Sequence, residues 1–425
     1  LPHSLPMRLP LAARAAPARA MAAAAGESPL FAPAQVGYVA LAHRLVYAPL
    51  TRCRADGAGV QPPSAATYYA QRASAPGTLL ISEATNIERA GQGYPNTPGL
   101  YTPAQLEAWQ PVTAAVHAAG GVFFAQLWHT GRVSHPAYQP DGRPPPAPSA
   151  VPCPAAGGVT LPDFTTVPYV VPREMGREEI AAVVSQYAAA ATAAIEAGFD
   201  GVEVHSANGY LLEQFLRESS NTRGDEYGGD QRWRLTADVV AAAAAAVGPD
   251  RVGVRLSPFG RFLMAPPSES DWRACDALVD RLATLGLAYL HMIEPRMTLG
   301  NEEIDVWDQS QTLDRWRARW VDAAGKPRPF ISAGGFTRTR ALAHLAAHPG
   351  DLIAVGRWWL STPDLPARWA AGAPLNAYDR GTFYAGGDKG YTDYPFLGDV
   401  KEGAPTRAAR DGSLVFGGGE DGAAE

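Results

Sequence analysis

Short apolar runs rich in β-branched residues alternate along the chain with longer segments whose apolar residues recur at helical spacing. The short runs predict eight β-strands, at Leu45–Ala48, Thr78–Ser82, Val122–Leu127, Gly201–His205, Val252–Leu256, Ala288–Met292, Phe330–Ser332 and Leu352–Val355. The longer segments predict helices at Gln105–Ala119, Arg177–Ala197, Leu235–Val247, Trp272–Leu285, Thr312–Ala323 and Arg338–Ala346. Eight strands that alternate with helices indicate an α/β protein with a parallel sheet, and eight strands close a (β/α)₈ TIM barrel.

An open, doubly wound sheet is the rival architecture. Such a sheet usually carries a glycine-rich dinucleotide-binding turn after its first strand, whereas here the first strand runs into Pro49-Leu50-Thr51-Arg52. The spacing G-x-G-x-x-G does occur at Gly417–Gly422, but no strand precedes it and no helix follows it. The closed barrel is therefore favoured.

Residues 29–400 are expected to form this barrel as a single domain. Residues 136–172 are crowded with proline and predict an inserted lid or hairpin after the third strand. Ser206–Gly229, after the fourth strand, is polar and rich in turn residues. Long loops at the carboxyl ends of barrel strands are where such enzymes build their sites.

Both ends of the chain differ from the barrel in composition. Residues 1–28 contain Arg8, Arg14 and Arg19, many alanines and no acidic residue before Glu27, which is typical of a transit segment for a plastid or another organelle. The alternative is a disordered tail without a targeting role on a cytoplasmic protein. Residues 401–425 are rich in glycine and alanine and are expected to be disordered.

Composition excludes several classes of partner. The net charge is -6 and the chain has no basic stripe, so we expect no nucleic-acid partner. No uncharged apolar run reaches the ~20 residues of a membrane-spanning helix. Cys53, Cys153 and Cys275 lie far apart and no His-x-His pair occurs, so we expect three free thiols and no metal site.

Two inward-facing side chains point to chemistry at the barrel mouth. Strand alternation puts Val202 and Val204 on one face of their strand and His205 on the other, so His205 points to the barrel axis if the valines pack on helices. By the same alternation Arg255 shares the face of Gly253. An arginine inside a barrel needs an anionic or electron-rich partner. A bound anion, a bound ring or a structural carboxylate would each serve.

The loops after the last two strands predict a phosphate site. Gly334 and Gly335 allow a ligand to approach the backbone closely, and the helix near Thr337 offers its N-terminus. Gly356 and Arg357 follow the eighth strand, where the guanidinium can make two bonds to one phosphate. Ordinary turn glycines and a surface arginine are the alternative.

The loop after the fourth strand supplies hydrogen-bond donors. His205 and Asn208 lie one turn apart and suit a carbonyl, nitro or phenolate oxygen. Tyr210 adds a hydroxyl that could deliver a proton to carbon. A structural histidine is the alternative for His205.

The chain resembles the classical branch of the old yellow enzyme family, and is similar to plant oxophytodienoate reductases and bacterial alkene reductases. Motifs that carry this resemblance follow one another from about Leu45 to Pro395. They are Ala48–Arg52, Gly93–Gly99, Gln126–Arg132, His205–Leu212, Asp225–Gly229, Ala354–Arg357 and Tyr378–Tyr384. Each motif is weak alone, whereas the order and spacing of the set are specific.

The resemblance implies an FMN-dependent ene-reductase that takes a hydride from NADPH, or from NADH, and reduces activated alkenes by ping-pong kinetics. It implies that the isoalloxazine would be lined by Pro49, Leu50, Thr51, Ala84 and Gln126, with Arg255 near its N1–C2=O edge. Gly335, Gly356 and Arg357 would hold the phosphate. His205 and Asn208 would bind the substrate oxygen, Tyr210 would be the proton donor, and Trp128 and Tyr384 would shape the pocket. We expect Phe259 to contribute to pocket size, and a monomer or a homodimer.

Two departures from the family pattern occur. Asp230–Arg234 replaces a Ser-Ile-Glu-Asn-Arg-like run, which puts in doubt the start of the next helix and any subunit contact there. Glu213 stands where Asn or Asp is common, and we expect it to affect loop packing rather than chemistry. The rival functions are a barrel glycosidase, which needs two facing carboxylates, and a non-catalytic flavin-binding barrel.

Overall fold

The computed structural model describes residues 28–297, 310–384, 386–399 and 406–407. The predicted transit segment lies outside these residues except for Ser28. Most of the predicted C-terminal tail also lies outside them. Thr406–Arg407 (β17) is described and pairs antiparallel with Leu375–Asn376 (β16).

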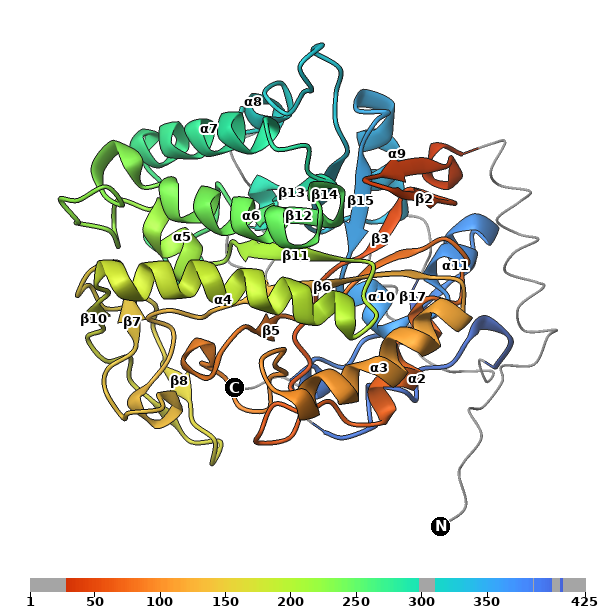
Figure 1. Cartoon of the computed structure of the whole chain (residues 1–425). Coiled ribbons are helices and arrows are strands. Elements are labelled where there is room, and N and C mark those ends of the chain that lie inside the picture. Colours follow the sequence, from red (N-terminus) through yellow and green to blue (C-terminus); the bar gives the residue numbers. More distant parts are fainter. Residues whose placement is uncertain (1–27, 298–309, 385, 400–405, 408–425) are drawn as a thin grey trace, which may run out of the picture.

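Eight parallel strands among the described residues close into a barrel, because the last strand pairs with the first (Figure 1). In order around the barrel they are β3 (Leu45–Tyr47), β4 (Leu79–Ile81), β6 (Val122–Trp128), β11 (Gly201–Ser206), β12 (Val252–Leu256), β13 (Tyr289–Ile293), β14 (Phe330–Ala333) and β15 (Leu352–Val355). Each predicted strand is present to within about a residue. The predicted (β/α)₈ barrel is confirmed.

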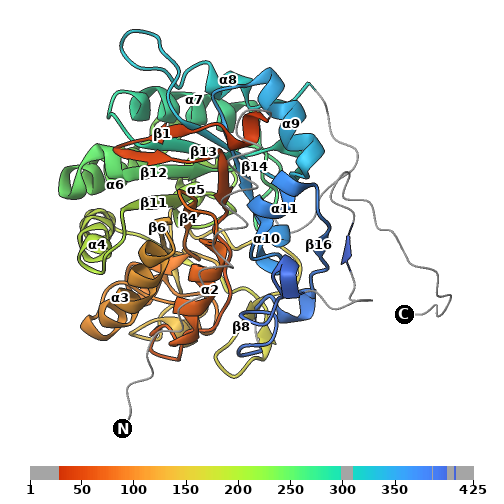
Figure 2. The ribbon, with the colours of Figure 1, turned by 90° about the vertical axis from the view of Figure 1, so that its right-hand side faces the viewer.

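Helices surround this barrel (Figure 2). They are α2 (Ser64–Arg72), α3 (Pro103–Ala118), α4 (Arg177–Glu196), α5 (Leu211–Leu216), α6 (Arg234–Val247), α7 (Glu269–Ala283), α8 (Asp314–Arg317), α9 (Arg338–Ala347), α10 (Arg357–Ser361) and α11 (Leu365–Ala371). Their starts follow ordinary capping chemistry, since Thr102 and Ser268 cap α3 and α7 in reciprocal capping boxes. Despite the unusual run Asp230–Arg234, α6 begins at Arg234.

The predicted helix Thr312–Ala323 is wrong, because α8 covers Asp314–Arg317 alone. After it the chain turns, and the Asp322 carboxylate accepts the backbone N–H groups of Ala324 and Lys326, both at 2.9 Å. Gly325 follows the turn with φ of +77°. A carboxylate that bonds its own downstream backbone competes with the helix, and here it prevails.

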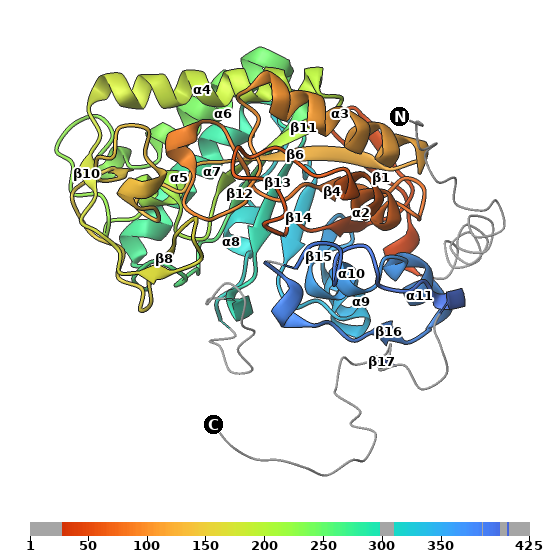
Figure 3. The ribbon, with the colours of Figure 1, turned by 90° about the horizontal axis from the view of Figure 1, so that it is seen from below.

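The insertion after β6 contains a short hairpin, as predicted. Its strands are β8 (Val159–Thr160) and β9 (Thr166–Val167), and a parallel pair, β7 (Pro146–Ala147) with β10 (Arg173–Glu174), joins its two ends. The Tyr138 hydroxyl donates to the Thr160 carbonyl at 2.6 Å and ties the hairpin to the start of the insertion. Figures 1 and 3 place the insertion on the opposite side of the molecule from α11.

The barrel interior is apolar at one end and polar at the other. Inward residues near the amino ends of the strands, such as Val46, Leu79 and Leu352, pack with the hairpin of β1 (Ala34–Val36) and β2 (Val39–Leu41). Further along the strands the inward residues are polar, and strand register sets their levels. Glu203 is paired with Gln126 and Gly253, and one level higher Arg255 lies between His205 and His291. A site is thereby confined to the carboxyl end.

None of the helices in the described residues combines the length and apolar character needed to cross a membrane. Cys53, Cys153 and Cys275 are buried, free thiols, as predicted.

Gly253 provides the room for a ring inside the barrel. A Cβ at Gly253 would lie 2.2 Å from the Tyr289 ring, a contact that no real Cβ makes. We expect Gly253→Ala to lower the free energy of unfolding by about 1–3 kcal/mol through overpacking, measured by urea unfolding. Gly57→Ala is the control, since a Cβ there meets nothing within 4 Å. Equal losses in the two variants would contradict this packing constraint.

Candidate active site

A cavity of about 550 Å³ opens at the carboxyl ends of the barrel strands. It falls within the usual size of small-molecule sites. Every predicted site residue lines it, namely Pro49, Leu50, Thr51, Ala84, Gln126, Trp128, His205, Asn208, Tyr210, Arg255, Gly334, Gly335, Gly356, Arg357 and Tyr384. The structure therefore brings together side chains from across the chain.

Phe259 is the exception among the expected pocket residues. It does not line the cavity, and its ring packs edge-on against Trp272 and Trp316 in the helix layer. Phe262, three residues later, lines the cavity instead. The expectation for Phe259 was wrong because the loop after β12 turns at Gly260 and sends the two rings to opposite sides.

His205, at the end of β11, is a neutral donor. The backbone N–H of Ala207 donates to His205 Nδ1 at 3.3 Å, which leaves Nε2 to carry the ring proton. Burial, followed by the charges of Arg255 and His291, holds the pKa of His205 well below its ordinary value. The ring is therefore uncharged near neutral pH. The alternation of Val202 and Val204 into the helix-facing core confirms the inward direction predicted for His205.

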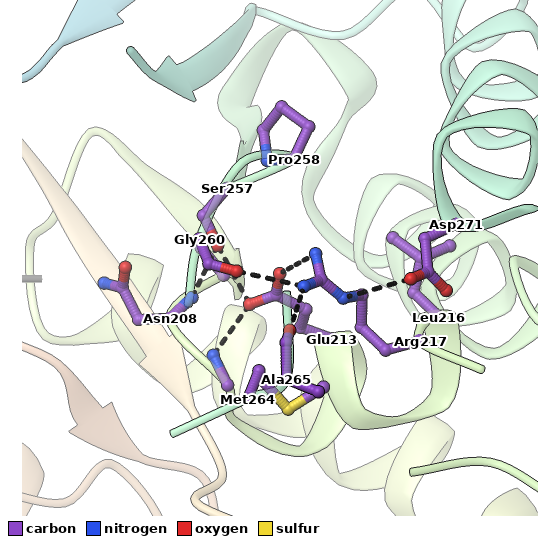
Figure 4. Close-up of polar contacts among 12 residues, drawn as sticks. Asn208, Glu213, Leu216, Arg217, Ser257, Pro258, Gly260, Met264, Ala265 and Asp271 are labelled. Carbon is purple, nitrogen blue, oxygen red and sulfur yellow. Dashed lines mark hydrogen bonds and ion pairs between the residues drawn. The ribbon is translucent and has the colours of Figure 1, made fainter. Parts of the chain in front are cut away.

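Asn208 is held by backbone rather than by its amide. It adopts φ of +57°, a left-handed conformation that asparagine tolerates, and its N–H donates to Ser257 Oγ at 2.8 Å. Figure 4 shows its side chain directed away from the Glu213–Arg217 pair. The amide is thus left for the cavity that it lines.

Glu213 fixes this loop from below (Figure 4). One carboxylate oxygen accepts the Gly209 N–H at 2.7 Å and the Ser257 hydroxyl at 2.9 Å, and the other lies 3.4 Å from Arg217. Burial raises the pKa of Glu213, while Arg217, the Gly209 N–H and Ser257 oppose the rise. Glu213 does not line the cavity, in agreement with the packing role expected for it.

Tyr210 lies in a cluster of aromatic rings with Tyr94, Trp128 and His205. Its ring meets Trp128 and His205 edge-on, with centroids 4.8 and 5.2 Å away. Its hydroxyl lies 3.2 Å from the Tyr94 hydroxyl. Burial raises the pKa of Tyr210 far above its ordinary value, so the phenol keeps its proton. Tyr94 belongs to the Gly93–Gly99 motif, but sequence reasoning assigned it no role.

Arg255 is half-buried and lies between the two histidines in strand register, and its buried Nε atom has no hydrogen-bond partner among the described residues. Burial lowers its pKa, which Glu203 partly offsets, but an arginine stays protonated in proteins. The described residues give it no ion pair within 4.0 Å. A half-buried cation that lines a cavity in this way is suited to a ligand with anionic or electron-rich edges.

The two glycine loops have the geometry of a close backbone approach. Gly334 has φ of +126°, and a Cβ there would lie 2.8 Å from Met297. Gly356 precedes α10, where a Cβ would lie 3.2 Å from Leu50, another cavity residue. Arg357 begins α10 and lines the same end of the cavity.

Two alternative chemistries lack their residues here. None of the described residues that line the cavity is aspartate or glutamate, so the paired carboxylates of a glycosidase are missing from it. Within the described part of the chain, no three His, Cys, Asp or Glu side chains gather as a metal site would require.

Residues 29–376 match a family model described as the NADH:flavin oxidoreductase / NADH oxidase family. 12-oxophytodienoate reductase 1 of Oryza sativa subsp. japonica is 44% identical over 399 residues, covering 93% of this chain and 99% of the relative. 12-oxophytodienoate reductase 2 of Arabidopsis thaliana is 44% identical over 376 residues, covering 87% of this chain and 96% of the relative.

Solved structures agree with these matches. Morphinone reductase in complex with tetrahydroNAD is 42% identical with a TM-score of 0.77, covering 87% of this chain and 97% of that one. The old yellow enzyme homologue from Zymomonas mobilis is 40% identical with a TM-score of 0.79, covering 87% and 99%.

Replacing Glu213 tests how the Asn208 loop is held. We expect Glu213→Ala to lower the free energy of unfolding by about 1–3 kcal/mol, because the Gly209 N–H loses its acceptor and Arg217 keeps only Asp271, 3.7 Å from its Nε. Glu213→Gln keeps an acceptor and should lose less. Urea unfolding measures both, and a change below about 0.5 kcal/mol in Glu213→Ala would contradict this reading of the contacts.

Proposed function

The chain belongs to the NADH:flavin oxidoreductase / NADH oxidase family, and on that premise we propose that it reduces the C=C bond of α,β-unsaturated carbonyl and nitro compounds. Membership makes it an FMN flavoprotein that takes electrons from a nicotinamide dinucleotide. The proposed donor is NADPH, with NADH as an alternative. The observation that carries the proposal is the neutral His205, whose ring proton lies on Nε2, in one cavity with Asn208 and the protonated Tyr210.

The cavity residues fit FMN. The guanidinium of Arg255 lines the cavity and suits the electron-rich pyrimidine edge of the flavin, and Gln126 offers an amide in the same cavity. Pro49, Leu50, Thr51 and Ala84 would line the ring system. At the other end Gly334, Gly335, Gly356 and Arg357 supply backbone N–H groups and a guanidinium for the phosphate. When bound, FMN would supply the transfer of a hydride from NAD(P)H to the β-carbon of the alkene.

The protein side chains then act on the acceptor. His205 Nε2–H and the Asn208 amide would donate to the substrate oxygen, which draws electrons from the C=C bond. Neutral donors suit this role because they bind the oxygen without transferring a full proton to it. The Tyr210 hydroxyl would protonate the α-carbon, and Trp128, which meets the Tyr210 ring edge-on, keeps that ring in place.

The relatives support an enone acceptor. Two of them are named as reductases of 12-oxophytodienoate and one as a reductase of morphinone, and both names denote ketones. We propose that the substrates of this chain also combine an activating oxygen with a large apolar body, because aromatic rings line the cavity beyond Tyr210. Trp128, Phe262 and Phe383 are among them.

Tyr210→Phe tests the proton donor. Reduction of cyclohexenone by the reduced enzyme should slow by about a hundredfold or more, because the substrate carbon has lost its acid. Reduction of FMN by NADPH should change little, because no protein proton is needed there. Stopped-flow absorbance of the two half-reactions measures each rate. Tyr187→Phe is the control, since Tyr187 is also buried, lies on α4 and does not line the cavity.

The raised pKa of Tyr210 also fixes the sign of the pH dependence. Below its pKa the hydroxyl holds its proton, so the alkene step should show no loss attributable to Tyr210 between about pH 6 and pH 9. If both half-reactions of Tyr210→Phe fell together, the proton-donor role would be wrong.

Phe164 tests the apolar body of the substrate. It lies at the tip of the β8–β9 hairpin, lines the cavity and is 58% exposed, and Tyr384, also at the cavity, is 46% exposed. We expect Phe164→Ala to lower kcat/KM about five- to thirtyfold for enones with a long alkyl substituent, the equivalent of ~1–2 kcal/mol of lost burial. Cyclohexenone should be little affected, because it does not reach the hairpin.

Val171→Ala is the matched control for that series. Val171 belongs to the same insertion and is also 58% exposed, but it does not line the cavity. A loss in Phe164→Ala that is the same for all alkyl lengths would refute the contact.

A further inference from the structure

A carboxylate is buried inside the barrel directly below the level of the site. Glu203, in the middle of β11, has no exposed surface, and it lies close enough to Tyr289 to raise the pKa of that phenol further, after burial. Oε1 accepts from Gln126 Nε2 at 2.7 Å, and Oε2 lies 2.8 Å from His291 Nδ1. Glu203 does not line the cavity, whereas Gln126 does. The mechanism above gives this carboxylate no part.

Its neighbours determine its charge. Burial alone would raise the pKa of Glu203, but His291, Arg255 and the Gln126 amide together lower it, so the carboxylate is ionised. Burial lowers the pKa of His291 despite the attraction of Glu203, so the ring is neutral and donates its Nδ1–H. Glu203 therefore carries a negative charge next to the positive charge of Arg255.

The two charges act on the cavity unequally. Arg255 lines the cavity, but Glu203 lies one level lower in the strand register, at the level of Gly253. They do not form an ion pair among the contacts within 4.0 Å, yet each shifts the pKa of the other. In a desolvated interior a carboxylate at this range still offsets part of the field of a guanidinium. Glu203 also fixes the end of the Gln126 amide that faces it, since a carboxylate can only accept.

We propose that Glu203 is a positioning residue for the flavin: it orients Gln126 and offsets the charge of Arg255, and thereby sets the reduction potential of bound FMN lower than Arg255 alone would. This inference rests on the proposed place of FMN above Arg255. A reduced flavin carries negative charge, so a guanidinium without its internal counter-charge would stabilise the reduced form more strongly.

Glu203→Gln tests the proposal in the FMN-loaded enzyme. The amide keeps the shape of the side chain and an acceptor for Gln126, but removes the charge. We expect the midpoint potential, measured by spectroscopic titration against reference dyes, to become more positive. The ratio of the FMN dissociation constants of the oxidised and reduced enzyme should rise at least about tenfold, which equals ~30 mV for a two-electron couple.

Two variants sharpen the comparison. Glu213→Gln makes the same substitution at a second buried carboxylate, which faces Arg217 and not Arg255, and its potential should match wild type. Glu203→Asp keeps the charge and should restore a potential near wild type. An unchanged or more negative potential in folded, FMN-saturated Glu203→Gln would overturn the proposal.

A measurement on the wild-type holoenzyme covers the case in which Glu203→Gln does not fold. Infrared difference spectra between the oxidised and reduced holoenzyme should show a shifted carboxylate band. If no carboxylate band shifts when FMN is reduced, the proposal is overturned. The outcome is separable from that of the proposed function. A yellow protein that reduces cyclohexenone with an unmoved potential in Glu203→Gln would disprove the role of Glu203 alone, whereas a protein without FMN or activity would disprove the function.

Discussion

A permanently charged guanidinium inside a barrel is the constraint around which the site is organised. Half-buried Arg255 lies between His205 and His291 in strand register, and its buried Nε atom lacks a partner among the described residues. Leaving such a cation uncompensated costs several kcal/mol, so its surroundings must either carry a negative charge or receive one. Both conditions are met here. The ionised Glu203 lies one register level toward the amino ends of the strands, and the cavity for a ligand lies at their carboxyl ends. The two flanking histidines stay neutral, because burial, helped by the charge of Arg255, lowers the pKa of each ring.

The residues of the cavity come from two kinds of segment, which differ in how firmly the fold holds them. Residues that would contact the flavin lie at strand ends or in tight glycine loops, where the parallel strand register fixes their relative positions. Residues that would contact the outer part of the substrate lie on the insertion and on the C-terminal segment, as Phe164 and Tyr384 do. Glu213 transfers some of the strand rigidity to the Asn208 loop by holding Gly209 and Ser257 together. Chemistry and selectivity can therefore change independently in this architecture.

Sequence reasoning reached the barrel and the residues of the cavity because both follow from short-range rules. Two-residue alternation in β11 sends the valines outward and Glu203 and His205 inward, and the predicted site residues other than Phe259 line one cavity. It failed where side chains compete with the backbone, as at Asp322, and where a loop turns, as at Phe259 and Gly260. The start of α3 was missed because the apolar pattern begins after the Thr102 capping box. Phe164 could not be found because nothing in the pattern fixes the direction in which a hairpin tip points.

Glu203 shows a further limit of pattern reading. Alternation predicts that its side chain points into the barrel, but the role of an inward carboxylate cannot be inferred until its hydrogen-bond partners are known. Those partners come from the third and sixth strands of the barrel, 77 and 88 residues away, and only closure of the sheet brings them together. Once it is closed, one carboxylate accepts from a cavity amide, accepts the Nδ1–H of a histidine that burial keeps neutral, and opposes the charge of Arg255. Removing any one of these groups would leave another charge or amide without its partner. The electrostatic potential at the barrel mouth therefore depends on all of them together.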